Sequence, residues 1–106
     1  MRFLVISKSK HLAPPDMMAP LFDAMIAWSN KLQASGKAEA MWSLAQGQGG
    51  GGIMNVDSLE ELNTLMLEFP FAAFSDIEVL PIVDLVPALQ RAKQVMAAMM
   101  QGGGGR

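Results

Sequence analysis

The segment Phe-Pro-Phe-Ala-Ala-Phe-Ser-Asp-Ile-Glu-Val, residues 69–79, decides the fold of this chain of 106 residues. Pro70 has no N–H and disfavours helical geometry in the residue before it, so a helix that precedes it must end there. Three of the five phenylalanines of the chain lie within the segment. From Asp76 to Val79 polar and apolar residues alternate, which is the period of a half-buried strand. The segment therefore predicts a tight corner, rich in aromatic side chains, between a helix and a strand.

On the N-terminal side of this corner, apolar residues recur at helical spacing and predict a helix that ends against Pro70. The residues Asp57-x-x-Glu60 fit a variant of the capping box, which predicts where this helix starts. The apolar positions are Leu59, Leu62, Leu65, Met66 and, on the same side, Phe69.

On the C-terminal side, we expect a strand over Asp76–Leu80, with its continuation past Pro81 to Val83 left open. Pro81 cannot donate a hydrogen bond to a neighbouring strand and therefore favours the edge of a sheet or a bulge. Apolar residues at three- and four-residue spacing then predict a helix over Val86–Met100. We expect the glycine-rich residues 102–106 to be a disordered tail.

The N-terminal part of the chain reads as a strand followed by an amphipathic helix. Arg2–Lys8 is β-branched and aromatic, with apolar residues on both faces, which is typical of a central strand. The helix is expected to begin at Asp16 or Ala19 and to end before Gly36, with Pro20 tolerated in the first turn. Its apolar face is Leu21, Met25, Trp28 and Leu32.

Two further strands are expected between the helices. The first spans Lys37–Ala45 and the second spans Ile53–Val56. Residues 46–52 are glycine-rich and are interpreted as a hairpin connection with a loose or bulged tip. We expect one face of the first strand to carry Ala38, Ala40, Trp42 and Leu44.

The resulting order, β-α-β-β-α-β with an extra C-terminal helix, is that of a ferredoxin-like α+β domain with a four-stranded antiparallel sheet. We expect a single domain over residues 1–101. Both helices of such a domain cover one face of the sheet, so an apolar second face needs a partner. A second copy related by a two-fold axis is the simplest partner, and two facing sheets would form a dimeric α+β barrel with a cavity.

The composition favours an oligomer and argues against several partners. Apolar residues make up 51% of the chain and charged residues only 17%, which predicts a homodimer or higher oligomer with an apolar interface. The net charge of −2 gives no basic footprint for nucleic acid. No apolar segment has the length of a membrane span or a signal peptide, so we expect a cytoplasmic protein without a membrane partner.

The chain resembles the muconolactone isomerase family over residues 42–79. The most specific part is the corner that leads from Pro70 to Asp76-Ile77-Glu78-Val79. The other residues that carry the resemblance are Trp42, Leu44, Ala45, Ser58, Glu60, Leu62, Thr64, Leu65 and Met66. The resemblance implies a ferredoxin-like subunit, a barrel dimer, no metal or organic cofactor, and a proton shift that moves a double bond within an unsaturated lactone.

The chain also departs from the pattern of that family. The family has ionisable side chains in its first strand, where this chain has Leu4 and Ile6. It has a histidine in the central hairpin, where this chain has Gly47. The scaffold signature is therefore better matched than the polar pocket.

The candidate catalytic residues are Glu78, Asp76 and His11. Glu78 and Asp76 lie two apart on one strand and point to the same face, as an acid/base pair would. The alternative is a solvated strand face, or ion pairs to Arg2 or Lys8. His11 is the only histidine, but a loop position beside lysines is also typical of a surface residue.

The candidate substrate-binding residues are Trp42, Leu4, Ile6 and Phe74. The glycines of 49–52 can let a ligand or a backbone approach closely, or can simply form a flexible tip. They are not followed by Lys-Ser/Thr and so do not form a phosphate loop. The methionines of the last helix fit either an adaptable pocket or oligomer packing.

The leading functional hypothesis is a cofactor-independent, isomerase-like enzyme that acts by proton transfer on a small apolar cyclic carbonyl compound or lactone. The alternative is a non-catalytic module for small-molecule binding or assembly on the same barrel fold. A cofactor-free monooxygenase is a weaker alternative, which rests on analogy of fold.

Overall fold

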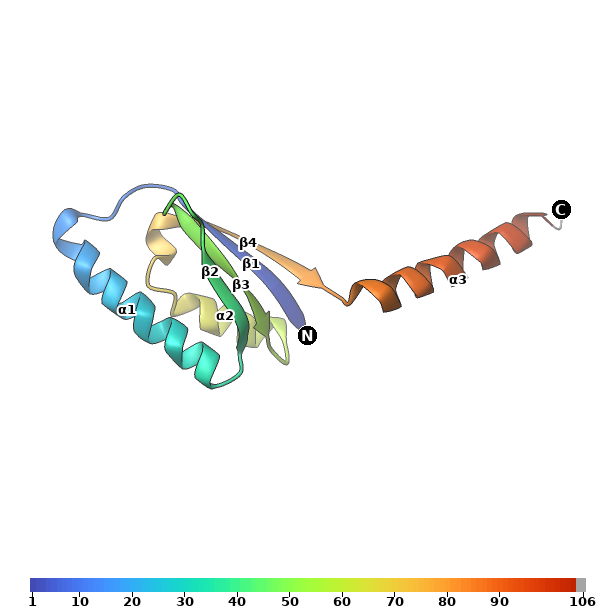
Figure 1. The fold of residues 1–106 in the computed structure, drawn as a ribbon, viewed down its shortest axis with the longest axis horizontal. Helices are drawn as coiled ribbons and strands as arrows, with labels where there is room; N and C mark the ends of the chain where they lie inside the picture. The colour runs from blue at the N-terminus through green and yellow to red at the C-terminus, as the bar shows by residue number, and fades with distance from the viewer. Residues whose placement is uncertain (105–106) are drawn as a thin grey trace.

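A computed structural model describes residues 1–104 of the chain. Four strands form one antiparallel sheet in the order β2-β3-β1-β4, and a last helix follows them (Figure 1). The predicted ferredoxin-like α+β fold with an extra C-terminal helix is confirmed. The elements are β1 Arg2–Ser9, α1 Pro15–Ala34, β2 Ala38–Ser43, β3 Gly49–Asn55, α2 Leu59–Leu67, the 3₁₀ helix η1 Ala72–Phe74, β4 Ser75–Ile82 and α3 Leu85–Gly104.

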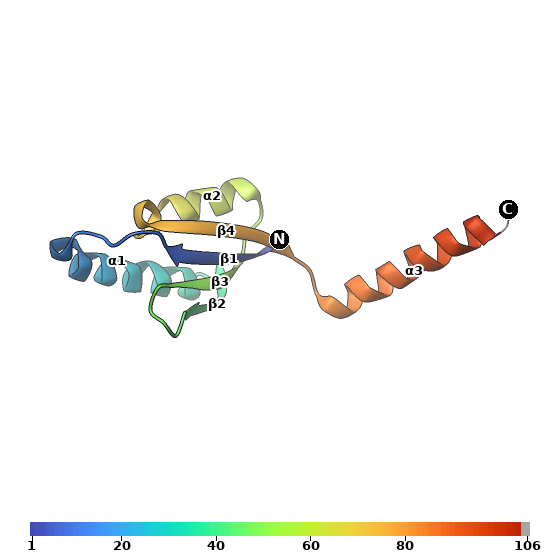
Figure 2. The same ribbon diagram turned by 90° about the horizontal axis from the view of Figure 1, so that it is seen from above.

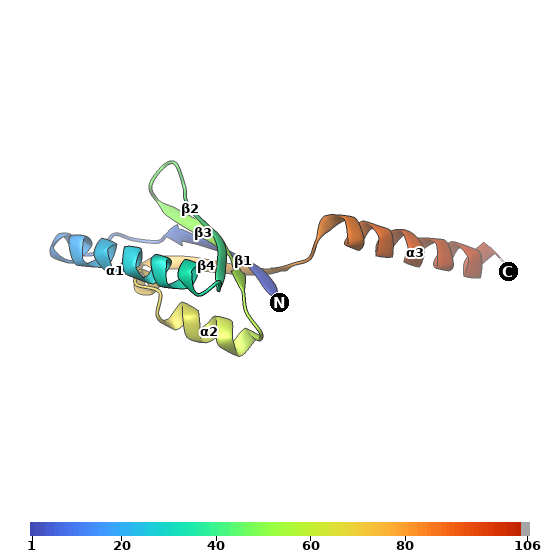
Figure 3. The ribbon, with the colours of Figure 1, turned by 60° about the horizontal axis from the view of Figure 1, so that its bottom comes forward.

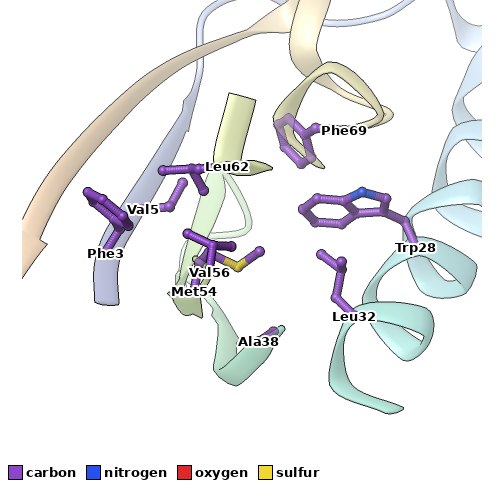
Figure 4. Close-up of a cluster of buried hydrophobic side chains, with 9 residues drawn as sticks. All are labelled: Phe3, Val5, Trp28, Leu32, Ala38, Met54, Val56, Leu62 and Phe69. Carbon is purple, nitrogen blue, oxygen red and sulfur yellow. The ribbon is translucent and has the colours of Figure 1, made fainter. Parts of the chain in front are cut away.

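The hydrophobic core lies between one face of the sheet and helices α1 and α2 (Figure 4). Phe3 and Val5 share a face of β1 because they are two residues apart. They cluster with Trp28 and Leu32 of α1 and with Leu62 of α2. Since both helices meet the same face of β1, no helix within residues 1–104 covers the opposite face of the sheet.

The phenylalanine corner closes one end of this core. Phe69 is buried, and its ring centroid lies 5.3 Å from that of Trp28. Phe71 contacts Phe22 of α1, with ring centroids 5.7 Å apart. The chain therefore passes from α2 through Pro70 and η1 into β4, which is the predicted aromatic corner between a helix and a strand. The aromatic contacts of this corner with α1 are seen only in the structure.

Both helix starts differ by a few residues from the predicted ones. α1 begins at Pro15 with Pro14 before it, so Asp16 lies in the first turn and is not the N-cap. Proline is favoured at the first helical position because its missing N–H has no partner there. α2 is capped by Ser58, whose Oγ accepts a hydrogen bond from the N–H of Glu61 at 3.1 Å, and not by Asp57.

The prediction that residues 46–52 form a loose hairpin tip is wrong for the glycines at 49–52. They belong to β3, which lies inside the sheet between β2 and β1. A Cβ atom on Gly50 would collide with the backbone carbonyl oxygen of Trp42 in β2. On Gly52 it would lie 2.9 Å from the carbonyl oxygen of Ala40. The glycines therefore allow neighbouring strands to approach closely, which was the other interpretation of this run.

The two edge strands are β2 and β4. A register shift between Ala38 and Ala40 places Ala38 on the core side, whereas Ala40 pairs with Ile53. The prediction that Ala38, Ala40, Trp42 and Leu44 share a face is therefore wrong, because a bulge reverses the alternation. β4 continues past Pro81 to Ile82, in the edge position that Pro81 predicts.

Helix α3 projects from the end of β4 away from the sheet (Figure 1). It gives the molecule a length of 70 Å against widths of 28 and 24 Å. The helix continues through residues 102–104, where the glycine-rich tail was expected to begin. The rest of that expected tail, residues 105–106, lies outside the described residues.

An ion pair between Lys37 and Glu61 ties the start of β2 to the first turn of α2. The hydrogen bond from Lys37 lowers the pKa of Glu61 below its ordinary value of 4.5, while desolvation opposes this effect. Stability from this pair is therefore present above pH 4.5 and is lost as the pH falls through the lowered pKa of the folded state.

We expect a Glu61→Gln variant to be less stable than the wild type near neutral pH, with the difference shrinking as the pH is lowered from 6 to 2. Urea unfolding at several pH values measures this. Glu60→Gln is the matched control, because Glu60 forms no ion pair within residues 1–104. A deficit in Glu61→Gln that stays constant across this range would contradict the assignment.

Candidate functional site

The sheet surface opposite the core is called here the open face. Because antiparallel partners point to the same side, the strand register shows which residues form it. The open face carries Ala40 and Trp42 from β2, Gly51 and Ile53 from β3, Leu4 and Ile6 from β1, and Glu78 and Leu80 from β4. Trp42 and Leu80 are 43% and 41% exposed, so a largely apolar surface faces outward.

One row of residues crosses all four strands of the open face and is called here the central row. Trp42 pairs with Gly51, Gly51 pairs with Ile6, and Ile6 pairs with Glu78. Three of the predicted site residues therefore lie on one line perpendicular to the strands. The sequence alone could not bring them together, because they come from β1, β2 and β4.

Gly51 determines how the indole of Trp42 lies in this row. A Cβ atom on Gly51 would be 2.9 Å from Nε1 of Trp42 and 3.0 Å from its Cε2. The indole therefore lies over Gly51, in space that any other residue would fill. As a result, the indole N–H is held above the middle of the sheet and is a hydrogen-bond donor on the open face.

Glu78 supplies the carboxylate of the central row. Two strand spacings, roughly 9.5 Å, separate the backbones of Gly51 and Glu78, with Ile6 between them. The indole donor therefore lies on one side of Ile6 in the row, and the carboxylate lies on the other side. The central row thus combines one hydrogen-bond donor with one carboxylate, a group type that can accept and return a proton.

Asp76 lies on the same face of β4, one row further along, and its register partner in β1 is Lys8. The alternative that Arg2 neutralises these acids is wrong. Arg2 donates to Glu39 at 3.0 Å and to Asp84 at 2.8 Å. Glu78 and Asp76 form no ion pair within residues 1–104 and remain exposed.

His11 and Phe74 lie together beyond the Asp76 end of the sheet. The imidazole ring and the Phe74 ring are nearly perpendicular, at 80°, with their centroids 5.8 Å apart. The backbone N–H of His11 also donates to the Phe74 carbonyl oxygen at 3.4 Å. These two predicted site residues therefore form a pair at the rim, outside the central row.

The apolar row next to the central row contains residues that sequence reasoning missed. Leu4 was predicted to bind substrate, but its neighbours Ala40, Ile53 and Leu80 were not. The alternation of residues 76–80 already placed Leu80 on the side of Glu78. Ala40 was already predicted to share a face with Trp42, whereas the position of Ile53 beside Leu4 depends on the register of the sheet.

No three His, Asp or Glu side chains within residues 1–104 gather as metal ligands would. None of the helices in this part of the chain is both long and apolar enough to cross a membrane.

Comparisons with known proteins agree with the fold of this chain. The family model described as muconolactone delta-isomerase matches residues 1–85. The crystal structure of a muconolactone isomerase is similar, with 23% identity and a TM-score of 0.73 over 81% of this chain and 92% of that one. A 5-chloro-2-hydroxyhydroquinone dehydrochlorinase from Burkholderia phenoliruptrix AC1100, in complex with 2,5-dihydroxybenzoquinone, is similar with 19% identity and a TM-score of 0.63, over 80% of this chain and 96% of that one. No curated protein sequence matches.

Proposed function

Because the chain belongs to the muconolactone delta-isomerase family, we propose that it moves a double bond in a small cyclic carbonyl compound by proton transfer, without a cofactor. The observation that carries this proposal is the central row. It sets one carboxylate and one indole donor on either side of an apolar floor. An unsaturated lactone has the matching chemistry, since it presents one carbonyl oxygen and an acidic C–H on a compact ring.

In the proposed reaction, the Glu78 carboxylate removes a proton from the carbon next to the carbonyl group. The electron pair moves onto the carbonyl oxygen and gives a dienolate, which the Trp42 N–H stabilises by a hydrogen bond. The protonated Glu78 then returns a proton to the far end of the dienolate. Glu78 removes one proton and returns one, so the product is an isomer of the substrate and no other reactant is needed.

The other predicted residues have supporting roles in this proposal. Asp76 adds a second negative charge along the same face of β4 and modulates Glu78. Leu4 and Ile6 form the apolar floor. His11 and Phe74 lie at the rim, where His11 is the weaker candidate for proton exchange with solvent and Phe74 can contact the substrate.

We propose that a second copy covers the open face and encloses this site. Trp42 and Leu80 are exposed on this face, so burying it in an interface removes apolar surface from water. A two-fold axis brings the same patch of the two copies into contact. Enclosure also serves catalysis, because a hydrogen bond to a developing oxyanion is stronger where water is excluded. The resulting assembly is the predicted dimeric α+β barrel.

A non-catalytic binding module is the second candidate function. The observation that favours it is the apolar row of Ala40, Ile53, Leu4 and Leu80, which offers no polar side chain to a reaction. Once a second copy covers it, this row would bind an apolar ligand by burial alone.

We expect the wild-type protein to isomerise at least one β,γ-unsaturated γ-lactone to its α,β-unsaturated form in deuterium oxide. Proton NMR follows the reaction, with deuterium appearing at the carbon that receives the proton. Heat-unfolded protein in the same buffer measures the spontaneous reaction. Ligand-induced shifts without any turnover or exchange would contradict the isomerase and support the binding module.

A further inference from the structure

Helix α3 has its large apolar side chains exposed along its length. Leu89 and Met96 are both 58% exposed, and Met99 and Met100 are 66% and 73% exposed. A helix that packs against nothing has little to stabilise it in water, because most helix stability in proteins comes from burying an apolar face. We therefore expect the exposed apolar side chains of α3 to be buried against a partner surface.

The apolar side chains of α3 form one stripe, called here the α3 stripe. Positions 85, 89, 92, 96 and 99 recur at spacings of four and three, which keeps them on one side of a helix. The opposite side carries the amides of Gln90 and Gln94. The α3 stripe consists of Leu85, Leu89, Ala92, Met96, Met99 and Met100.

The start of α3 adjoins the open face. Arg2 pairs with Asn55 and with Ile82, which places these three at the end of the open face next to the apolar row. They line one hollow together with residues from the first turns of α3, namely Pro87, Ala88 and Arg91. Figures 2 and 3 show that α3 extends beyond the end of the sheet near the N-terminus, clear of α1 and α2.

These positions make the open face and α3 neighbouring uncovered surfaces. A second copy that covers the open face therefore comes within reach of α3. At 1.5 Å per residue, a helix of this length extends roughly 30 Å, which is comparable to the 28 Å width of the molecule. One helix can thus span the domain of a second copy.

The charges favour the domain of that copy over its α3 as the docking surface. The only charged residues of α3 are Arg91 and Lys93. All ten acidic residues lie within residues 1–84, against five basic ones. Pairing two α3 helices would bring only positive charges together, whereas the acidic domain of a second copy attracts them.

We propose that α3 is an arm that packs across the globular domain of a second copy, with the α3 stripe against that domain. The inference rests on the dimer suggested under the proposed function. Under two-fold symmetry, the α3 helix of each copy packs on the globular domain of the other, so the barrel has one arm on each of two sides. Apart from its first residue, Leu85, α3 lies beyond residues 1–85, which the family model matches.

Sedimentation equilibrium of full-length variants tests the arm. In Leu89→Glu/Met96→Glu the added charges lie on the α3 stripe, and in the control Gln90→Glu/Gln94→Glu the same charges lie on the opposite side. We expect the stripe variant to raise the dimer Kd about 100-fold or more, because two large side chains lose their burial. The dimer Kd of the control should stay within about 3-fold of the wild-type value, since its substituted side chains remain in solvent. An unchanged Kd in the stripe variant would overturn the proposal.

A second measurement separates docking on the domain from pairing of two α3 helices. Since the chain has no cysteine, Met96→Cys introduces a single thiol. Docking on the domain keeps the two thiols apart, so mild oxidation should give no covalent dimer. Rapid disulfide formation would overturn domain docking, and so would binding of the wild-type monomer to anionic phosphatidylserine vesicles. Failure of the proposed function gives a different result from failure of the arm. The wild-type protein would then be inactive, but its dimer Kd would still rise in the stripe variant.

Discussion

A Glu78→Gln variant is expected to lose about 100-fold or more of its turnover, because a positioned acid or base contributes roughly 10²–10⁴-fold. The amide keeps the size of the side chain but can neither accept nor return the proton. The carboxylate forms no ion pair within the described residues, so the fold should not depend on it. We expect kcat to fall with little change in KM, and an unchanged unfolding midpoint.

Asp76→Asn is the matched control for this variant. It removes a carboxylate from the same face of β4, one row away from the central row. In our proposal Asp76 modulates Glu78 without touching the transferred proton, so its loss should cost roughly 10-fold or less. Equal kcat in Glu78→Gln and wild type would remove Glu78 as the base, and His11→Gln would become the decisive variant.

A Gly50→Ala variant is expected to lose about 2–3 kcal/mol of unfolding free energy, in the range of other overpacked interiors. Its new methyl group would collide with the backbone carbonyl oxygen of Trp42, and 3.4 Å away would lie Cα of Ser43. Backbone atoms of a paired strand cannot swing aside as a flexible side chain can. We therefore expect β2 to separate from β3 locally. Thermal unfolding followed by circular dichroism should show a fall in Tm of roughly 10 °C or more.

Gly102→Ala controls for the substitution itself. Gly102 lies in α3, and no atom other than the nearby backbone of its own helix and its chain neighbours lies within 4 Å of the place its Cβ would take. Alanine is the better helix former by about 1 kcal/mol, so this variant should keep or slightly raise stability. If Gly50→Ala proved as stable as Gly102→Ala, the close approach of β2 to β3 would be wrong.

Sequence patterns were sufficient wherever a local rule decides the structure. Pro70 must stop a helix, and the alternation after Asp76 must form a strand, whatever surrounds them. The order of elements follows from such rules, and the order is enough to predict the ferredoxin-like fold. The same alternation placed Glu78 and Asp76 on one face.

The candidate site could be predicted only in part, since its residues come from different strands. The sequence predicts each site residue from its own strand only. The register of the sheet shows that four of them share the open face, namely Glu78, Leu4, Ile6 and Trp42. Gly51 was missed because its contribution is the space that it leaves for an indole from another strand.

By itself, the sequence of this chain determined the elements, their order and the face of each regular strand, because these depend on neighbours along the chain. The tertiary structure alone decided that the glycines of β3 lie inside the sheet, since their need for space comes from the backbones of β1 and β2. It also decided the bulge that turns Trp42 to the open face, and the projection of α3 away from its own domain. These features depend on contacts between distant segments, or on their absence within residues 1–104, and no local pattern records such contacts.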